Sequence, residues 1–327
     1  MKYNIRLDVC TLCKLNCPTC TMRLLNYGGN GAGYLTFENY KKFLNNNENQ
    51  IKRIEISNAG EPFLNPEIID ILKYSKEKNI DITCNNGTTL NFNNKKILEA
   101  LVDYEVKSVV VAIDGITQEC YEKYRRNGNL NLVLENLKYL LDYKKQKNST
   151  LPEVKWQYVI MENTEDKEQI IGAKEMAKSL GIEICFKLTW DRSYIPKNEV
   201  ELKELTNLNY LTQTQYEKST GKLYRRDDKF NNKCGQLWSF PQINWDGKVM
   251  GCCANRIPFN INVFDLGENS IQKLFNNEEF KSAKDWLCNK NTDIITPCHS
   301  CQNSFKIREN GGMDTEFISK WNKLYNL

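Results

Sequence analysis

Three cysteines lie close together near the N-terminus, in the loop Cys13-x3-Cys17-x2-Cys20. A four-iron four-sulfur cluster takes four ligands, normally cysteine thiolates. A loop that offers three thiolates therefore leaves one iron open to a group that does not belong to the protein. This spacing constrains the fold more than any other feature, because one short loop must bring three sulfurs to the same cluster.

Two other interpretations of these cysteines use different chemistry. Zinc would require the longer run Cys10-x2-Cys13-x3-Cys17-x2-Cys20. Zinc sites, however, pair C-x2-C units across a gap of roughly 12 to 20 residues. A disulfide framework is typical of small secreted domains, whereas this chain has 327 residues. The spacing favours the iron-sulfur cluster over both alternatives.

The composition limits the remaining classes of function. The sequence has no N-terminal signal peptide and no apolar run long enough to span a membrane, so we expect a cytoplasmic protein with no membrane partner. In such a protein, a count of 13 cysteines points first to metal ligands or catalytic residues and not to disulfides. The 45 Lys and Arg and the 41 Asp and Glu residues are scattered along the chain, which argues against nucleic-acid binding. With His299 as the single histidine, acid–base work would fall to Asp, Glu, Lys, Tyr or Cys.

Short β-rich runs alternate with amphipathic helical patterns over residues 1–190. We expect strands at residues 5–9, 53–57, 81–84, 108–113, 155–160 and 182–188, with helices at 36–44, 66–78, 95–104, 130–144 and 166–180. This alternation predicts an α/β fold with a parallel sheet and crossover helices. Six strands are too few for a complete eight-unit barrel, so we expect an open, partial (β/α)6 TIM-type barrel. Its ligands should lie at the carboxyl ends of the strands, where the cysteine loop follows the first strand.

The cysteine loop directly after the first expected strand resembles that of the radical S-adenosylmethionine superfamily. The resemblance implies that the amino and carboxylate groups of S-adenosylmethionine bind the open iron. It also implies reductive cleavage to a 5′-deoxyadenosyl radical that abstracts hydrogen from a substrate. In such an enzyme the protein supplies orientation and exclusion of side reactions. The implied partners are a small-molecule or peptide substrate and an electron donor such as a flavodoxin or a ferredoxin.

The resemblance also implies which strand ends bind S-adenosylmethionine. Gly60-Glu61 follows the second strand, where the family commonly has Gly-Gly-Glu and holds the methionyl amino group, although Ala59 replaces the first glycine here. Asn86, after the third strand, resembles a residue that lines the cavity. Asp114, after the fourth, resembles a residue near the ribose and the methionyl carboxylate. An ordinary turn is the alternative for Gly60-Glu61.

Three further residues are candidates for the same site. Arg125 or Arg126 offers a guanidinium that could pair bidentately with a carboxylate. Either arginine could instead be a solvated charge at the end of a helix. Asn163, after the fifth strand, is expected to face adenosine.

A second set of cysteines comprises Cys234, Cys252, Cys298 and Cys301. Asp246-Gly247 is a hairpin signal, and a hairpin there would return the chain so that Cys252 approaches Cys234. The pair in Cys298-x2-Cys301 would then complete four thiolates, enough to fill every corner of a four-iron cluster. A zinc ribbon is the alternative for this set.

This second set resembles the twitch form of the SPASM domain, which holds auxiliary clusters. No cysteine follows Cys301, so the resemblance implies one auxiliary cluster and two four-iron four-sulfur clusters in all. We expect a radical S-adenosylmethionine partial barrel at residues 1–195 and a linker of helix and loops at 196–230. A small cluster-binding domain, a β-hairpin plus helices, is expected at 231–327.

The resemblance leaves the reaction open between two outcomes. Oxidation of the substrate radical would give a dehydrogenase, and quenching by a thiol would give an epimerase. Cys253 and Cys288 are candidates for that catalytic thiol, although free cysteines are more often buried as small hydrophobes.

The expected substrate is a sugar, an aminocyclitol or a similar small polar metabolite. Peptide-modifying relatives more often carry a second auxiliary cluster and an N-terminal peptide-binding domain, and we expect neither here. Radical epimerisation or crosslinking of a ribosomal peptide is the alternative reaction. A zinc-stabilised interaction module and an iron-sulfur electron carrier are the alternatives without catalysis.

Overall fold

The computed structural model describes residues 2–24, 26, 28–189, 194–208, 214–217, 222–225, 234–253, 255, 257–313 and 319. The chain forms two compact units from interleaved stretches. Unit 1 comprises residues 1–12, 25–83 and 229–327, and unit 2 comprises residues 13–24 and 84–228. The units are divided differently from the domains expected at 1–195, 196–230 and 231–327, whose boundaries stay predictions.

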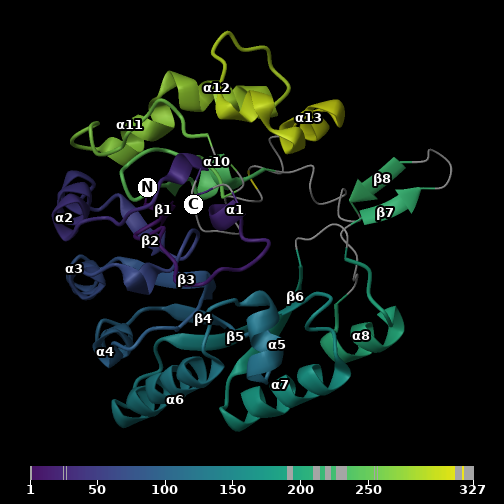
Figure 1. Cartoon of the computed structure of the whole chain (residues 1–327). Helices are drawn as coiled ribbons and strands as arrows, with labels where there is room; N and C mark the ends of the chain where they lie inside the picture. The colour runs from purple at the N-terminus through teal and green to yellow at the C-terminus, as the bar shows by residue number, and fades with distance from the viewer. Residues whose placement is uncertain are drawn as a thin grey trace. The chain divides into compact units, whose positions relative to one another are not determined.

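The seven-stranded sheet has the strand order β6-β5-β4-β3-β2-β1-β9. Strands β1 to β6 are labelled in Figure 1. From β1 to β6 the strands cover Tyr3–Leu7, Ile51–Glu55, Asp81–Thr88, Ser108–Ala112, Glu153–Ile160 and Glu183–Leu188. The pairs β1–β2 and β2–β3 in unit 1 are parallel, and so are β4–β5 and β5–β6 in unit 2. All six expected strands are present in sequence order, which confirms the parallel α/β sheet and agrees with a partial barrel.

The seventh strand, β9 at Gln242–Ile243, was not expected from the sequence. It pairs in parallel with β1, with Arg6 opposite Gln242 and Leu7 opposite Ile243. Two residues are too few to carry the alternation that identifies a strand. This strand therefore exists because of its tertiary pairing and not because of a local pattern.

In most helices of unit 2, the side chain of the residue just before the helix caps its N-terminus. The helices cover Thr21–Leu24 (α1), Lys95–Asp103 (α4), Gln118–Tyr124 (α5), Leu130–Gln146 (α6), Lys167–Ser179 (α7) and Glu199–Thr206 (α8). Each of the last five begins after an Asn, Thr or Asp whose side chain accepts a backbone N–H of the first turn. Figure 1 shows α4 and α6 side by side. On β5, the side chains of Trp156 and Tyr158 are fully buried.

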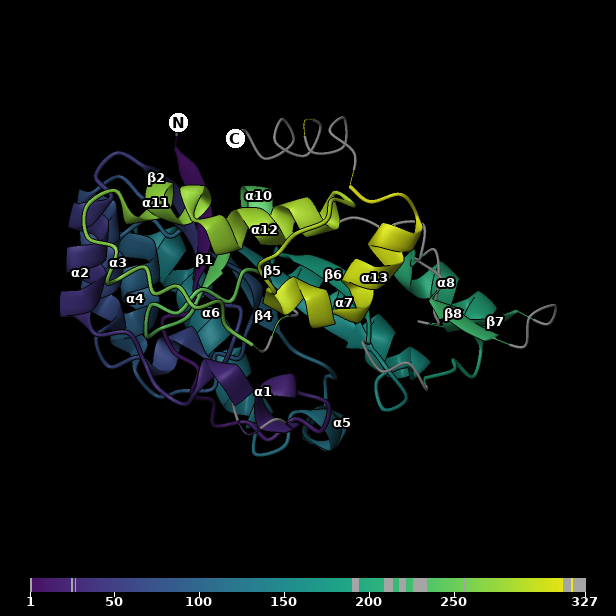
Figure 2. The ribbon, with the colours of Figure 1, turned by 90° about the horizontal axis from the view of Figure 1, so that it is seen from above.

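Unit 1 gathers helices from both ends of the chain. They cover Phe37–Asn46 (α2), Ile68–Glu77 (α3), Gln236–Ser239 (α10), Ser270–Asn276 (α11), Glu278–Leu287 (α12) and Gln302–Glu309 (α13), and 3-10 turns lie at Gly28–Asn30, Pro62–Leu64 and Pro297–Ser300. Figure 2 shows α11 and α12 running one after the other. The Phe275 ring stacks on Tyr3 of β1 at 4.7 Å. Asn47, after α2, donates to the Ser270 hydroxyl at 2.7 Å, so the C-terminal helices are packed on N-terminal elements.

The stretch expected as a linker contains more regular structure than the sequence indicated. Helix α8 lies in it as expected, but β7 at Thr214–Glu217 and β8 at Lys222–Arg225 form an antiparallel pair. These strands are short and polar, so they lack the apolar alternation that predicts a strand. The rest of residues 209–230 lies outside the described residues. No helix in the described part of the chain is long and apolar enough to cross a bilayer.

A buried carboxylate joins three segments at one end of unit 1. Asp8, directly after β1, is 0% exposed. Its Oδ1 accepts the Ala59 N–H at 3.0 Å, and its Oδ2 accepts the side-chain amide of Gln242. Its own N–H donates to the Ile243 carbonyl at 3.0 Å. The end of β1 is thereby tied to the turn after β2 and to β9.

Replacing Asp8 by Ala should lower the free energy of unfolding by roughly 2 to 4 kcal/mol, because buried donors would lose a charged acceptor. Urea denaturation followed by circular dichroism measures the change. The control is Glu77→Ala at the exposed end of α3, which should change stability by at most about 0.5 kcal/mol. Equal effects of the two substitutions would contradict the anchoring role of Asp8.

Candidate functional site

The three-cysteine loop lies in unit 2 and leads directly into α1. Cys17 is 7% exposed, and Cys13 and Cys20 are partly exposed. The Cys20 N–H donates to the Cys17 carbonyl at 3.2 Å, and the Leu24 N–H donates to the Cys20 carbonyl at 2.9 Å. The loop is therefore turned by its own backbone hydrogen bonds between the second and third cysteine. Cys10 is fully buried, and burial raises its pKa to about 11.

The loop is held by hydrogen bonds to the last residue of α5 and to the segment that follows it. The Asn16 N–H donates to the Arg126 carbonyl at 2.9 Å, and the Thr19 hydroxyl lies 2.8 Å from the Tyr124 hydroxyl. Leu15 reaches Gly128 so closely that a Cβ there would lie 3.3 Å from its methyl group. The residues between the cysteines thus rest on the C-terminal end of α5.

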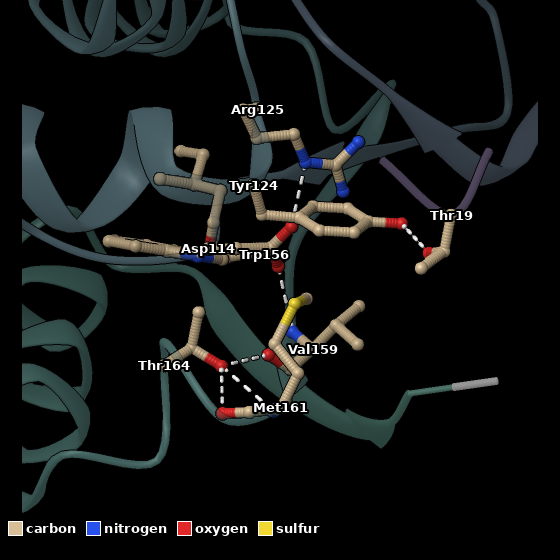
Figure 3. Close-up of polar contacts among 9 residues, drawn as sticks. Thr19, Asp114, Tyr124, Arg125, Trp156, Val159, Met161 and Thr164 are labelled. Atoms are coloured by element: carbon tan, nitrogen blue, oxygen red, sulfur yellow. Dashed lines mark hydrogen bonds and ion pairs between the residues drawn. The ribbon is translucent and has the colours of Figure 1, made fainter. Parts of the chain in front are cut away.

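A buried ion pair dominates the electrostatics beside the loop (Figure 3). The Arg125 Nε donates to Asp114 Oδ2 at 2.7 Å, and the two side chains are 14% and 0% exposed. Burial by itself would lower the pKa of Arg125, but the Asp114 carboxylate raises it above its ordinary value. Burial also raises the pKa of the Cys17 thiol, and the charge of Arg125 opposes that rise. Arg125 is therefore a fixed cation next to a loop thiol and favours its thiolate.

The ion pair is supported from β5. The Val159 N–H donates to Asp114 Oδ1 at 2.8 Å, so both carboxylate oxygens accept a hydrogen bond. The Trp156 indole donates to the Ile113 carbonyl at 2.7 Å, and the Thr164 hydroxyl donates to the Val159 carbonyl at 2.6 Å (Figure 3). These contacts fix Asp114 in a fully buried position. Of the pair, Arg125 is the member that reaches the surface.

The other cofactor candidates of unit 2 lie at its surface. Arg126, Asn86 and Asn163 are exposed. The carbonyl of Asn163 accepts the Cys120 thiol at 3.1 Å. The two arginines, which the sequence alone does not distinguish, therefore differ: Arg125 is held in a buried pair and Arg126 is solvated. Binding of S-adenosylmethionine by these residues remains a prediction.

The Gly60-Glu61 turn lies in unit 1 and packs on the residues just before the cysteine loop. Gly60 has a φ of +64°, and a Cβ there would lie 2.3 Å from the Thr11 carbonyl carbon. The Glu61 N–H donates to the Leu12 carbonyl at 2.8 Å, and Glu61 is 2% exposed. Its carboxylate accepts the Phe63 N–H at 3.5 Å. Glycine is therefore required here by backbone packing, whatever the turn binds.

The four cysteines of the second set, all in unit 1, interact electrostatically. Burial raises the pKa of Cys234 well above its ordinary value, and Cys252, Cys298 and Cys301 raise it further. Burial likewise raises the pKa of Cys298 to about 12, with contributions from Cys252 and Cys301. The set thus gathers four thiols from three distant segments, which fits the ligand requirement of a four-iron cluster.

The expected hairpin brings one of these thiols into place. Ile243 and Val249 form an antiparallel bridge, and Gly247 has a φ of +84° at the turn. The Asn244 N–H donates to the Lys248 carbonyl at 2.8 Å. The hairpin around Asp246-Gly247 is therefore confirmed. Among the described residues, no three or more His, Cys, Asp or Glu side chains converge on the position of a single metal ion.

The two candidate catalytic cysteines lie in unit 1. Cys253 is exposed, its N–H donates to the Gln236 side-chain oxygen at 2.9 Å, and its sulfur accepts the Gln236 amide at 3.3 Å. Cys288 ends α12, and burial raises its pKa. Cys253 is thus exposed and bound to Gln236, whereas Cys288 is partly buried, and the roles of both remain predictions.

Sequence reasoning missed two sets of polar contacts: those of Asp8 in unit 1 and the contact of Thr19 with Tyr124 in unit 2. Asp8 lies within the first expected strand, where an acidic residue in an apolar run was a usable signal. Thr19 and Tyr124 pair across distant segments, and no local pattern could have indicated that contact.

Comparison with known proteins agrees with the sequence resemblance. Residues 8–152 match the family model of the Radical SAM superfamily, and residues 234–302 match that of SPASM, an iron-sulfur cluster-binding domain. The first range contains the three-cysteine loop and the Asp114–Arg125 pair. The second contains all four cysteines of the auxiliary set. The first match implies a four-iron four-sulfur cluster and S-adenosylmethionine. The second implies auxiliary iron-sulfur binding and favours a cluster over zinc.

Individual relatives are distant. An AdoMet-dependent heme synthase of Methanosarcina barkeri is 28% identical over 173 residues, which is 52% of this chain and 45% of the relative. A GTP 3′,8-cyclase of Alkaliphilus metalliredigens is 28% identical over 142 residues, which is 42% of each protein. The chain thus spans less than half the length of these curated relatives. In fold it is similar to Streptococcus suis SuiB bound to S-adenosylmethionine, with a TM-score of 0.64 and 16% identity over 98% of this chain and 74% of that chain.

Replacing Arg125 by Met should lower the free energy of unfolding by roughly 3 kcal/mol, because Asp114 would be left buried without a cation. The adjacent Arg126→Met is the matched control, and its effect should stay within about 0.5 kcal/mol. Chemical denaturation of both variants measures the difference. The double variant Asp114→Leu/Arg125→Met should regain most of the loss, and a double variant less stable than Arg125→Met would contradict the pairing.

Proposed function

The chain belongs to the radical S-adenosylmethionine superfamily and carries a C-terminal SPASM iron-sulfur domain, and on this premise we propose that it abstracts hydrogen from a small polar substrate of the sugar or aminocyclitol type. When bound, the first cluster and S-adenosylmethionine supply a 5′-deoxyadenosyl radical. Cys13, Cys17 and Cys20 would hold this cluster, and Arg125 would favour the Cys17 thiolate. A flavodoxin or a ferredoxin is the proposed electron donor.

The observation that carries the substrate class is an amide on β5. Gln157 is 7% exposed, and its Oε1 has no hydrogen-bond partner among the described residues. A buried polar atom without a partner costs about 1 to 3 kcal/mol, so a bound hydroxyl, amine or water that donates to it would be stabilising. A small polar ligand has such donors.

Small side chains surround this amide. Ala112 is the register partner of Gln157 on β4. A Cβ at Gly87 on β3 would lie 3.2 Å from Gln157 Nε2 and 3.4 Å from the Ala112 Cβ. Gly87 and Ala112 lie near the carboxyl ends of their strands, where ligands of parallel sheets bind. Larger side chains at either position would fill the space beside the amide.

Both the oxidative and the isomerising outcome fit this proposal. Dehydrogenation would pass one hydrogen atom to the 5′-deoxyadenosyl radical, one electron to the auxiliary cluster and one proton to solvent, so the product would be two hydrogens lighter than the substrate. Epimerisation instead returns a hydrogen atom from a donor thiol, for which Cys253 and Cys288 are the proposed candidates. A thiyl radical formed in that step must be reduced by one electron and one proton, which the same external electron donor would supply.

Cys13→Ala should abolish 5′-deoxyadenosine formation when the anaerobically reconstituted protein receives dithionite and S-adenosylmethionine. Its iron content should fall by about four atoms per chain, because one of two four-iron clusters is lost. Cys10→Ala is the matched control and should keep both the product and the iron. Product formation by Cys13→Ala, or its loss in Cys10→Ala alone, would contradict the three-cysteine assignment.

Incubation in deuterated water with a panel of hexoses, hexosamines and aminocyclitols separates the two reactions. An epimerase should give an isomer that carries one deuterium, because a thiol exchanges its hydrogen with solvent. A dehydrogenase should give a product two mass units lighter without deuterium at the reacting carbon. Mass spectrometry reads both results, and turnover of none of the panel while a peptide is turned over would overturn the proposed substrate class.

A further inference from the structure

The loop that carries Cys298 and Cys301 lies at the surface and needs support from outside itself. It forms the 3-10 turn Pro297–Ser300, none of whose residues is buried. Between the cysteines, the His299 ring accepts the Thr296 N–H at Nδ1, at 3.0 Å. Its Nε2 lies 3.0 Å from the Thr292 hydroxyl. Both ring nitrogens are thus engaged, and the ring is held as a structural group.

Trp286 on α12 supports the face of that ring. The Trp286 and His299 rings stack with centroids 4.1 Å apart and planes inclined by 27°. The same indole donates from Nε1 to the Ser304 hydroxyl at 3.3 Å. One side chain therefore contacts the residue between the two cysteines and a residue on the helix that follows them.

Ser304 links Trp286 to both cysteines through hydrogen bonds to their backbone carbonyls. It is 1% exposed, and its hydroxyl donates to the Cys301 carbonyl at 2.8 Å and to the Cys298 carbonyl. A hydroxyl has one hydrogen, so the donation is shared. Because the indole occupies a lone pair of this oxygen, Trp286 fixes the direction in which the hydroxyl donates.

A fixed positive charge lies on the same indole. The Arg308 guanidinium carbon is 3.7 Å from the Trp286 ring centroid. Its Nη1 donates to the Trp286 carbonyl at 2.6 Å and to the Lys290 carbonyl at 3.1 Å. The charge is permanent, since arginine stays protonated in proteins, and its position depends on Trp286.

We propose that Trp286 is a positioning residue for the auxiliary cluster: it holds the Cys298–Cys301 loop in ligand geometry and places the charge of Arg308 beside it. Cluster potentials depend on local charge and hydrogen bonding. A nearby cation stabilises the more negative, reduced cluster, so Arg308 raises the reduction potential. This inference rests on the proposed assignment of Cys298 and Cys301 as ligands.

The test uses the full chain with Cys13, Cys17 and Cys20 changed to Ala, so that the auxiliary cluster is the remaining one and no turnover is needed. After anaerobic reconstitution and desalting, iron and sulfide are counted and the potential is titrated by electron paramagnetic resonance. Trp286→Leu should retain less than half of the parent iron, and Trp286→Phe should retain more than Trp286→Leu. Arg308→Met should keep the iron but shift the potential to a more negative value, and Arg308→Lys should restore it.

Phe305→Ala is the matched control. Phe305 touches Trp286 only edge-on at 6.2 Å and is 46% exposed, so this variant should match the parent in iron and potential. The inference is overturned if Trp286→Leu and Arg308→Met behave like Phe305→Ala. Cys298→Ala should lose the cluster in this background. Retention there would overturn the ligand assignment itself, separately from the role of Trp286.

Discussion

The electrostatics of the three-cysteine loop in unit 2 depend on the ion pair between Asp114 and Arg125. A carboxylate that is 0% exposed must be compensated, and Arg125 does so from the end of α5. From that position the positive charge of Arg125 also acts on Cys17 and opposes the rise of its pKa. The neighbouring Tyr124 and Arg126 hold the cysteine loop through Thr19 and Asn16. One short segment after α5 thus sets both the charge and the support of the thiols.

In unit 1, the loop of Cys298 and Cys301 is held in place by different interactions. Among the described residues, no fully buried acid contacts this C-x2-C loop. The support of this loop comes from ring stacking and from the Ser304 hydroxyl. Each site has an arginine near its cysteine loop: Arg125 acts on the Cys17 thiol, and Arg308 lies on Trp286, whose ring stacks on His299. A net negative cluster is favoured by such cations, so the protein's contribution is to hold them in place.

How far the sequence predicts this protein depends on the range of the interactions. The strands and helices of the first 190 residues follow from local patterns, and capping residues such as Asn129 and Asp166 mark the helix starts. The two cysteine motifs are also local, and the comparisons confirm the family that they indicate. β9, the β7–β8 pair and the anchoring role of Asp8 depend on contacts between distant segments. For the same reason the choice between Arg125 and Arg126 needed the position of Asp114, which no pattern in the Tyr124–Gly128 stretch reveals.

The two faces of β5 explain why a chain with one histidine suits this chemistry. Trp156 and Tyr158 point to one side and are fully buried, so they serve packing. Lys155 and Gln157 point to the other. There Lys155 forms ion pairs with two glutamates at 3.0 and 2.9 Å, and the amide oxygen of Gln157 has no partner within the described part of the chain. A radical reaction asks the protein for few proton transfers, because the hydrogen atom moves to a cofactor-derived carbon. In the proposed reaction the side chains would orient a polar substrate, and an uncharged amide beside small residues suits that task better than a titrating group.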